Sequence, residues 1–135
     1  MTIEQIIHDT LAADSAVAAL VGTRISPLHS TQATARPCIT YEISTTESIS
    51  TAAGPTGWYR ATIELGLFAD TFKAVVQLSD AVQRTLDGYS GITSGIDVAQ
   101  VTLDDTSDVE QATTPGTEKP VYVRTQTFLT LYHAT

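Results

Sequence analysis

The sequence predicts an α+β fold: a mixed, mainly antiparallel sheet with two helices packed on one face, and long loops. Two segments, near the N-terminus and over residues 75–86, carry apolar residues at the three- and four-residue spacing of an amphipathic helix. Residues 37–44 and 58–68 alternate apolar with polar side chains, and residues 120–133 are rich in β-branched and aromatic types. With 135 residues, 42% of them hydrophobic, the chain is expected to form one domain, 1–135, with its own core.

The first helix is expected to begin at Thr2. Thr2 stands three residues before Gln5, the spacing of a capping box, and apolar residues follow at helical intervals. Asp14 is placed to cap a second short helical turn, and Gly22 to end it in the left-handed conformation. Residues 24–27 are then expected to form a short extended edge that a proline limits, and residues 30–36 a polar loop.

Residues 37–44 and 58–68 are expected to pair as an antiparallel hairpin. The thirteen residues between them, Thr45 to Gly57, are mostly small and polar, with Ile49 as the apolar anchor. Because pairing alone needs only two to five connecting residues, we expect a long loop here, and a loop of this length usually either has a function or is disordered.

The next helix is expected to start from Asp70 as its N-cap and to end at Gly88. Its apolar residues recur at a strict three- and four-residue spacing and form one stripe. We expect this stripe to pack on the sheet face that carries Ile63 and Leu65. The stripe consists of Val75, Leu78, Val82 and Leu86.

A strand over residues 96–103 and a second long loop, Asp104–Lys119, are expected next. The loop is rich in Asp, Glu, Thr, Pro and Gly and is too polar to bury. The last strand, residues 120–133, carries apolar side chains on both of its faces, which predicts a central place in the sheet.

Composition excludes several classes of function. Seven Lys and Arg against 15 Asp and Glu leave a net charge of −8, so the phosphate attraction of a non-specific DNA-binding protein is missing. The single cysteine, Cys38, lies in an apolar strand and is interpreted as a buried, unreactive thiol. No run approaches the ~18 apolar residues of a membrane span, and no leader pattern opens the chain. We expect a soluble protein made in a cytoplasm, with no membrane partner.

Chemistry-bearing motifs are missing from the sequence. The carboxylates of the second loop lack the ligand spacing and the sixth-position glycine of an EF-hand, and the histidines share no zinc-ligand spacing. There is no Gly-x-Ser-x-Gly elbow and no phosphate-binding Gly-x-x-x-x-Gly-Lys loop, although a Ser-His-Asp triad stays open because its members need only meet in space. We therefore expect no enzyme, and no catalytic, cofactor-binding or metal-binding residues.

Several strings, taken in their order and spacing, resemble a known family. They are Ala18–Pro27 (AALVGTRISP), Arg36–Tyr41 (RPCITY), Leu67–Thr71 (LFADT) opening a helix that ends in Leu-Asp-Gly, Leu103–Asp105 (LDD) and Arg124–Tyr132. Over nearly the whole chain this pattern resembles the tail-completion, or tail-terminator, proteins of long-tailed bacteriophages.

The resemblance implies a structural virion protein. Copies would form a six-fold ring that closes the tail tube and joins it to the head. Implied partners are further copies of the chain, the tail-tube protein and a head–tail connector or stopper protein, and DNA would pass through the lumen without specific binding. The resemblance also assigns the two long loops, 45–57 and 104–119, to partner binding, because a terminator needs segments that reach the layers above and below it. The candidate contact residues on these loops are Thr46, Ile49, Thr51, Gly54, Pro55, Asp105, Asp108, Glu110 and Thr114. Such a protein would be made in the host cytoplasm and reside in the tail or neck of the virion.

Two other interpretations stay open at this point. One keeps the virion setting but makes the protein a head-side adaptor or stopper of the neck. The other, of a different class, is a small acidic ligand-binding or enzymatic domain. A compact monomer with a deep pocket would favour this last interpretation, whereas a ring in virions would favour the first two.

Overall fold

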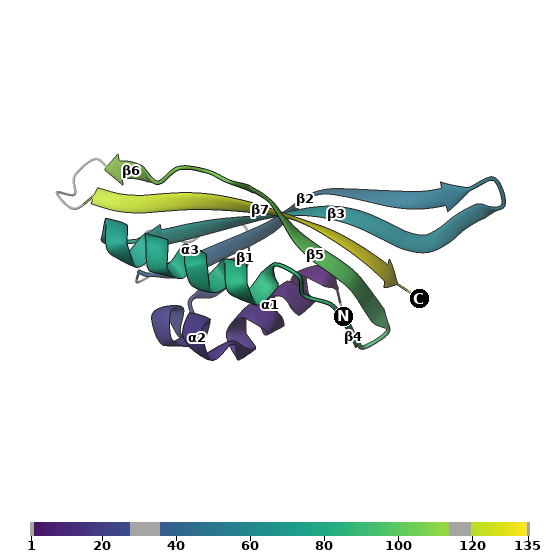
Figure 1. Cartoon of the computed structure of the whole chain (residues 1–135), viewed down its shortest axis with the longest axis horizontal. Coiled ribbons are helices and arrows are strands. Elements are labelled where there is room, and N and C mark those ends of the chain that lie inside the picture. The colour runs from purple at the N-terminus through teal and green to yellow at the C-terminus, as the bar shows by residue number, and fades with distance from the viewer. Residues whose placement is uncertain (1, 28–35, 114–119, 135) are drawn as a thin grey trace.

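The computed structural model describes residues 2–27, 36–113 and 120–134. In these ranges the chain forms three helices and seven strands (Figure 1). In chain order they are α1 (Ile3–Ala13), α2 (Ser15–Val21), β1 (Ile25–Pro27), β2 (Cys38–Thr51), β3 (Gly54–Ala69), α3 (Phe72–Leu86), β4 (Gly91–Thr93), β5 (Ile96–Thr106), β6 (Glu110–Thr113) and β7 (Pro120–Ala134).

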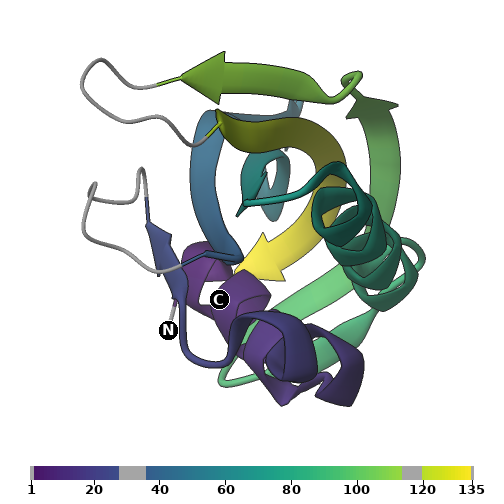
Figure 2. The ribbon, with the colours of Figure 1, turned by 90° about the vertical axis from the view of Figure 1, so that its left-hand side faces the viewer.

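The strands form one curled, mixed sheet, which confirms the α+β class (Figure 2). Its order is β1-β2-β3-β7-β5-β4, and β6 pairs with β7 beyond the end of β5. β1 is parallel to β2, and the other pairings of the described strands are antiparallel. The described residues form three helices where two were expected, because residues 15–21 form a complete short helix rather than a turn. Figure 1 shows the helices below the sheet.

One hydrophobic core lies between the helices and the sheet. On β3 the odd-numbered residues from Ala61 to Ala69 are buried, and their even-numbered neighbours on the other face are half-buried. Cys38 is buried at the start of β2, as predicted. The predicted stripe of α3 belongs to the same core, and its residues Val75, Leu78, Val82 and Leu86 are all fully buried.

The first two helices begin where the sequence predicts. Thr2 Oγ1 accepts a hydrogen bond from Gln5 N at 3.3 Å, and Asp14 Oδ2 accepts one from Val17 N at 3.0 Å. Gly22 ends α2 as expected and has a positive φ of +58°, but its ψ of −122° lies outside the left-handed helical region that was predicted. Each cap satisfies a backbone N–H that the helix itself leaves without a partner.

The predicted cap of α3 is wrong by one residue. Thr71, not Asp70, is the N-cap, and its Oγ1 accepts from Ala74 N at 3.1 Å. The carboxylate of Asp70 instead accepts from Arg36 Nε at 2.7 Å. Both residue types cap helices well, so the choice depends on this long-range ion pair, which the local sequence does not reveal.

The expected loop of residues 45–57 is also wrong, because these residues extend β2 and β3 into a long hairpin. β2 runs to Thr51 and β3 starts at Gly54, so only residues 52–53 connect them. The register shifts after Ile43 and again after Ile49. Both faces of this outer hairpin are largely exposed, so it shows no apolar alternation, while its β-branched threonines are well suited to a strand.

The second expected loop, residues 104–119, is partly strand. β5 continues to Thr106, and β6 then pairs with the start of β7. Between them Ser107 N donates to Thr125 O at 2.8 Å, and Ser107 Oγ accepts from Thr125 N at 2.9 Å, so the connection stays on β7. Residues 114–119, Thr114 among them, lie outside the described residues. The central place predicted for the last strand is confirmed, since β7 lies between β3 and β5.

Candidate functional site

The clearest candidate for partner contact is the arm, which we define as residues 45–58 of the β2–β3 hairpin. β7 pairs with β3 from Trp58 onwards, and residues 45–48 pair with residues 59–62 of that flanked part, so only residues 49–58 of the arm extend beyond β7. Figure 1 shows the arm projecting past the helices and past the end of β7. It collects all the contact residues predicted from the first loop: Thr46, Thr51 and Pro55, which are exposed, and Ile49 and Gly54, which are half-buried.

Contacts at the base of the arm fix its direction. Thr56 Oγ1 donates to the carbonyl oxygen of Ile49 at 2.7 Å and accepts from Trp58 N at 3.2 Å. The rings of Trp58 and His133 meet edge to face with their centroids 5.2 Å apart. Gly57 has a φ of +83°, and a Cβ there would lie 2.7 Å from His133 Nε2, so the position requires glycine. The arm therefore leaves the sheet as a braced extension of two strands.

The outer edge of β2 is open along the arm. β1 pairs with β2 only over residues 39–41, and among the described residues no strand pairs with this edge from Glu42 to Thr51. Strand edges in soluble proteins are commonly blunted by charge, and the charged residues of this stretch are Glu42 and Glu47. Free backbone N–H and C=O groups along such an edge are suited to receive a strand from another chain.

The predicted contact residues of the second loop are spread along one side of the sheet. Asp105 lies on β5, Asp108 in the connection and Glu110 on β6, and all three are exposed. Within the described ranges no three His, Cys, Asp or Glu side chains converge as metal ligands, and no helix there is long and apolar enough to cross a membrane. β6 and the arm lie at opposite ends of the sheet (Figure 1), so the two predicted contact sets do not form one site.

Negative charge gathers on the face of the sheet that faces away from the α3 stripe. One row of paired residues crosses four strands there and reads Glu42, Glu64, Thr127 and Asp105. The pKa of Glu64 is raised above its ordinary value, first by the side-chain hydrogen bond to Glu42, then by desolvation and by repulsion from the same carboxylate. Like charges directly opposite on neighbouring strands are destabilising, so this row costs stability. The sequence does not reveal it, because the row depends on the strand register.

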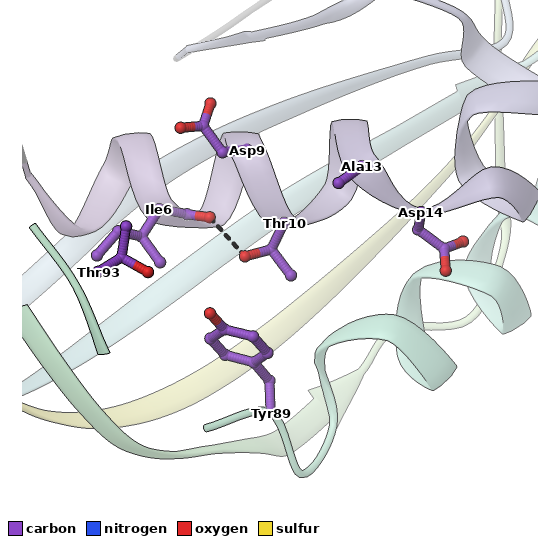
Figure 3. Close-up of a pocket in the computed structure, with 7 residues that line it drawn as sticks. All are labelled: Ile6, Asp9, Thr10, Ala13, Asp14, Tyr89 and Thr93. Atoms are coloured by element: carbon purple, nitrogen blue, oxygen red, sulfur yellow. Dashed lines mark hydrogen bonds between the residues drawn. The ribbon is translucent and has the colours of Figure 1, made fainter. Parts of the chain in front are cut away.

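An open apolar groove lies between α1 and the segment that joins α3 to β4, with a volume of about 390 Å³. Figure 3 shows the ring of Tyr89 pointing from that segment toward α1, where Thr10 Oγ1 donates to Ile6 O at 2.7 Å. None of the lining residues is basic. We name this site the α1 groove, lined by Ile6, Asp9, Thr10, Ala13, Asp14, Tyr89 and Thr93.

The lining of the α1 groove favours docking over catalysis. The Thr10 hydroxyl is hydrogen-bonded to its own helix, Asp14 caps α2, and Asp9 Oδ1 lies 3.2 Å from His8 Nδ1. The lining residues therefore include no nucleophile in contact with a base, which covalent catalysis requires. The groove has an apolar floor and two carboxylates, those of Asp9 and Asp14. It is therefore suited to bind an apolar side chain that has a positively charged side chain next to it.

Comparison with known proteins agrees with the resemblance seen in the sequence. A chain in the solved structure "Virion of native gene transfer agent (GTA) particle" shares the fold, with a TM-score of 0.72 and 15% sequence identity over 95% of this chain and 92% of that chain. No match is found among curated proteins. The family model described as Tail completion protein gp17 matches residues 5–132, nearly the whole chain. The chain therefore belongs to the tail completion protein gp17 family, whose members are structural proteins of phage tails.

Proposed function

We propose that this protein closes the end of a bacteriophage tail tube as a six-fold ring and joins the tail to the head. Family membership supports the tail and the virion as its setting. The observation that carries the finer proposal is the arm, because a ring subunit that connects successive layers needs an element that reaches beyond its own core. Its proposed partners are further copies of the chain, the tail-tube protein and a head–tail connector or stopper protein.

A strand hairpin is well suited to this reach. Its backbone hydrogen bonds are made within the hairpin, so it keeps its shape without a core of its own. The part of β2 that extends beyond β7, residues 49–51, reaches about 10 Å at the ~3.3 Å rise per residue of a strand. That length is enough to bring the tip of the arm into contact with a neighbouring subunit or layer.

The charge of the protein fits a channel for DNA. A net charge of −8 on each copy, repeated around a ring, repels phosphate groups and lets DNA slide without sticking. The acidic row that contains Glu42 and Glu64 adds to this repulsion wherever its face turns toward the lumen. We therefore propose that DNA passes this protein without being bound by it.

Shortening the arm tests the proposal. Replacing Ser50–Gly57 with Asn-Gly, which favours a two-residue hairpin turn, leaves the Ile49–Trp58 pair beside the new turn. The core is untouched, so the domain should fold, and heads and tails should form without being joined. Electron microscopy of lysates counts joined particles, and plaque titre measures infectivity.

A control variant with a full-length arm distinguishes the effect of shortening the arm from the effect of the Asn-Gly turn sequence. The double variant Ala52→Asn, Ala53→Gly places the same dipeptide at the tip of the full-length arm and should yield normal particles. Infectious particles from the shortened arm would contradict the role given to it. Electron microscopy also locates the ring: a ring on the head side would favour the adaptor or stopper, and a monomer that carries a small ligand would favour a ligand-binding domain.

A further inference from the structure

An exposed aromatic side chain lies at the start of α3, whereas the α1 groove lies near the end of that helix. Phe72 is the first residue of α3 and is 57% exposed, although it is large and apolar. Its ring meets Tyr122 edge to face with the centroids 6.4 Å apart, and most of the ring stays in water. Lys73 follows it and is exposed as well. We name Phe72 and Lys73 the knob.

The knob is positively charged in a protein that is otherwise acidic. Lys73 forms no salt bridge within the described residues, and the nearby carboxylate of Asp70 is already paired with Arg36 at 2.7 Å. The N-terminus of α3 adds the positive end of a helix dipole at the same place. The α1 groove is the electrostatic complement, since Asp9 and Asp14 line it and no basic residue does.

We propose that the knob of one copy of this chain enters the α1 groove of the next copy, with the Phe72 ring on its apolar floor and Lys73 beside Asp9. The groove volume of about 390 Å³ exceeds the ~300 Å³ at which sites for small ligands begin, so one phenyl ring fits. The occupant is a second copy because the charges of knob and groove match and both surfaces belong to this chain. This inference rests on the proposed ring.

The positions of knob and groove set the symmetry of the contact. Phe72 begins α3, whereas Tyr89 of the groove lies just beyond its end. A helix of 15 residues is about 22 Å long, so a subunit does not fill its own groove. A contact between two different surfaces propagates head to tail and closes into a ring when the rotation between subunits allows it.

Four variants of the full chain test the contact by sedimentation velocity over a range of protein and salt concentrations. Phe72→Ser should weaken self-association roughly 30-fold or more, as expected for a buried aromatic anchor. Lys73→Glu and Asp9→Lys should each weaken it, and the double variant should recover much of the loss because the pair is restored with its signs exchanged. Arg84→Glu makes the same charge change as Lys73→Glu at another exposed site of α3 and should leave self-association unchanged.

Cysteine cross-linking tests the same contact in assembled particles, including the case in which the free chain is monomeric. Ala13→Cys combined with Phe72→Cys should give an oxidation-dependent ladder of covalent multimers from purified tails, and neither single variant should. Rings that assemble normally from Phe72→Ser and give no ladder from the double-cysteine chain would overturn this contact but leave the proposed function intact. Absence of the unmodified chain from purified particles would overturn both this contact and the proposed function.

Discussion

Truncation of Leu78 tests how α3 packs on the sheet. Leu78 is fully buried at the middle of α3 and shares one core with Ile63 and Leu65 of β3. Leucine-to-alanine changes at such sites cost about 2–5 kcal/mol of unfolding free energy, and the cost rises when the cavity cannot collapse. Here the sheet side of the cavity is β3, which is paired on both edges by β2 and β7. We therefore expect Leu78→Ala to cost about 3–5 kcal/mol, measured by urea unfolding at a fixed protein concentration because assembly adds a concentration-dependent contribution.

A neighbouring exposed residue supplies the control for this measurement. Gln77→Ala removes a side chain from the solvent side of the same turn of α3 and should change the unfolding free energy by less than about 0.5 kcal/mol. A loss below about 1 kcal/mol for Leu78→Ala would refute the reasoning. It would mean that the stripe of α3 is not packed on β3 and that Leu78 is exposed in the folded protein.

Three further predictions concern caps, pH and metals. Thr71→Val should cost about 1 kcal/mol through loss of the α3 cap, and Asp70→Ala, which would also remove a capping side chain, clearly less. The reverse order in urea unfolding would restore Asp70 as the cap. Because protonated Glu64 donates a hydrogen bond to Glu42, the pKa of Glu64 is raised in the folded state, and stability should fall as pH rises through that raised pKa. Glu64→Gln should remove this fall in a melting-temperature profile from acid to neutral pH. Neutralising the carboxylates of segment 104–110 should leave melting unchanged, and calorimetry with calcium or magnesium should show no binding; stoichiometric micromolar binding would establish a metal site.

Hydrophobic patterning predicts the parts of this fold that have one buried face. It identifies α1, α3 and the inner halves of β2 and β3, because burial on one side leaves a period of two or of 3.6 in the sequence. The central strand β7 is identified instead by its β-branched and aromatic residues on both faces. The outer half of the hairpin is exposed on both faces, so threonine and serine occupy both parities and the period is lost. The segment containing β6 is missed for the same reason, since its polarity is that of a loop.

The candidate sites depend on contacts that no local pattern encodes. Four of the five contact residues assigned to the first loop lie on the projecting part of the arm and Thr46 lies at its base, but the element is a paired hairpin and not a loop. The α1 groove joins Ile6 to Tyr89, residues far apart in the sequence, and the pairing of Glu42 with Glu64 requires the register of the hairpin. One available signal was Phe72, a large apolar residue at the start of a helix and outside its apolar stripe.

The central place of β7 also sets the order in which the sheet can be completed. During synthesis β3 and β5 leave the ribosome before residues 120–134, and the edges with which they flank β7 stay unpaired until then. Trp58 at the base of the arm likewise meets His133 only after that later segment has been made. A chain that lacks residues 120–134 therefore lacks both the strand between β3 and β5 and the ring that contacts Trp58.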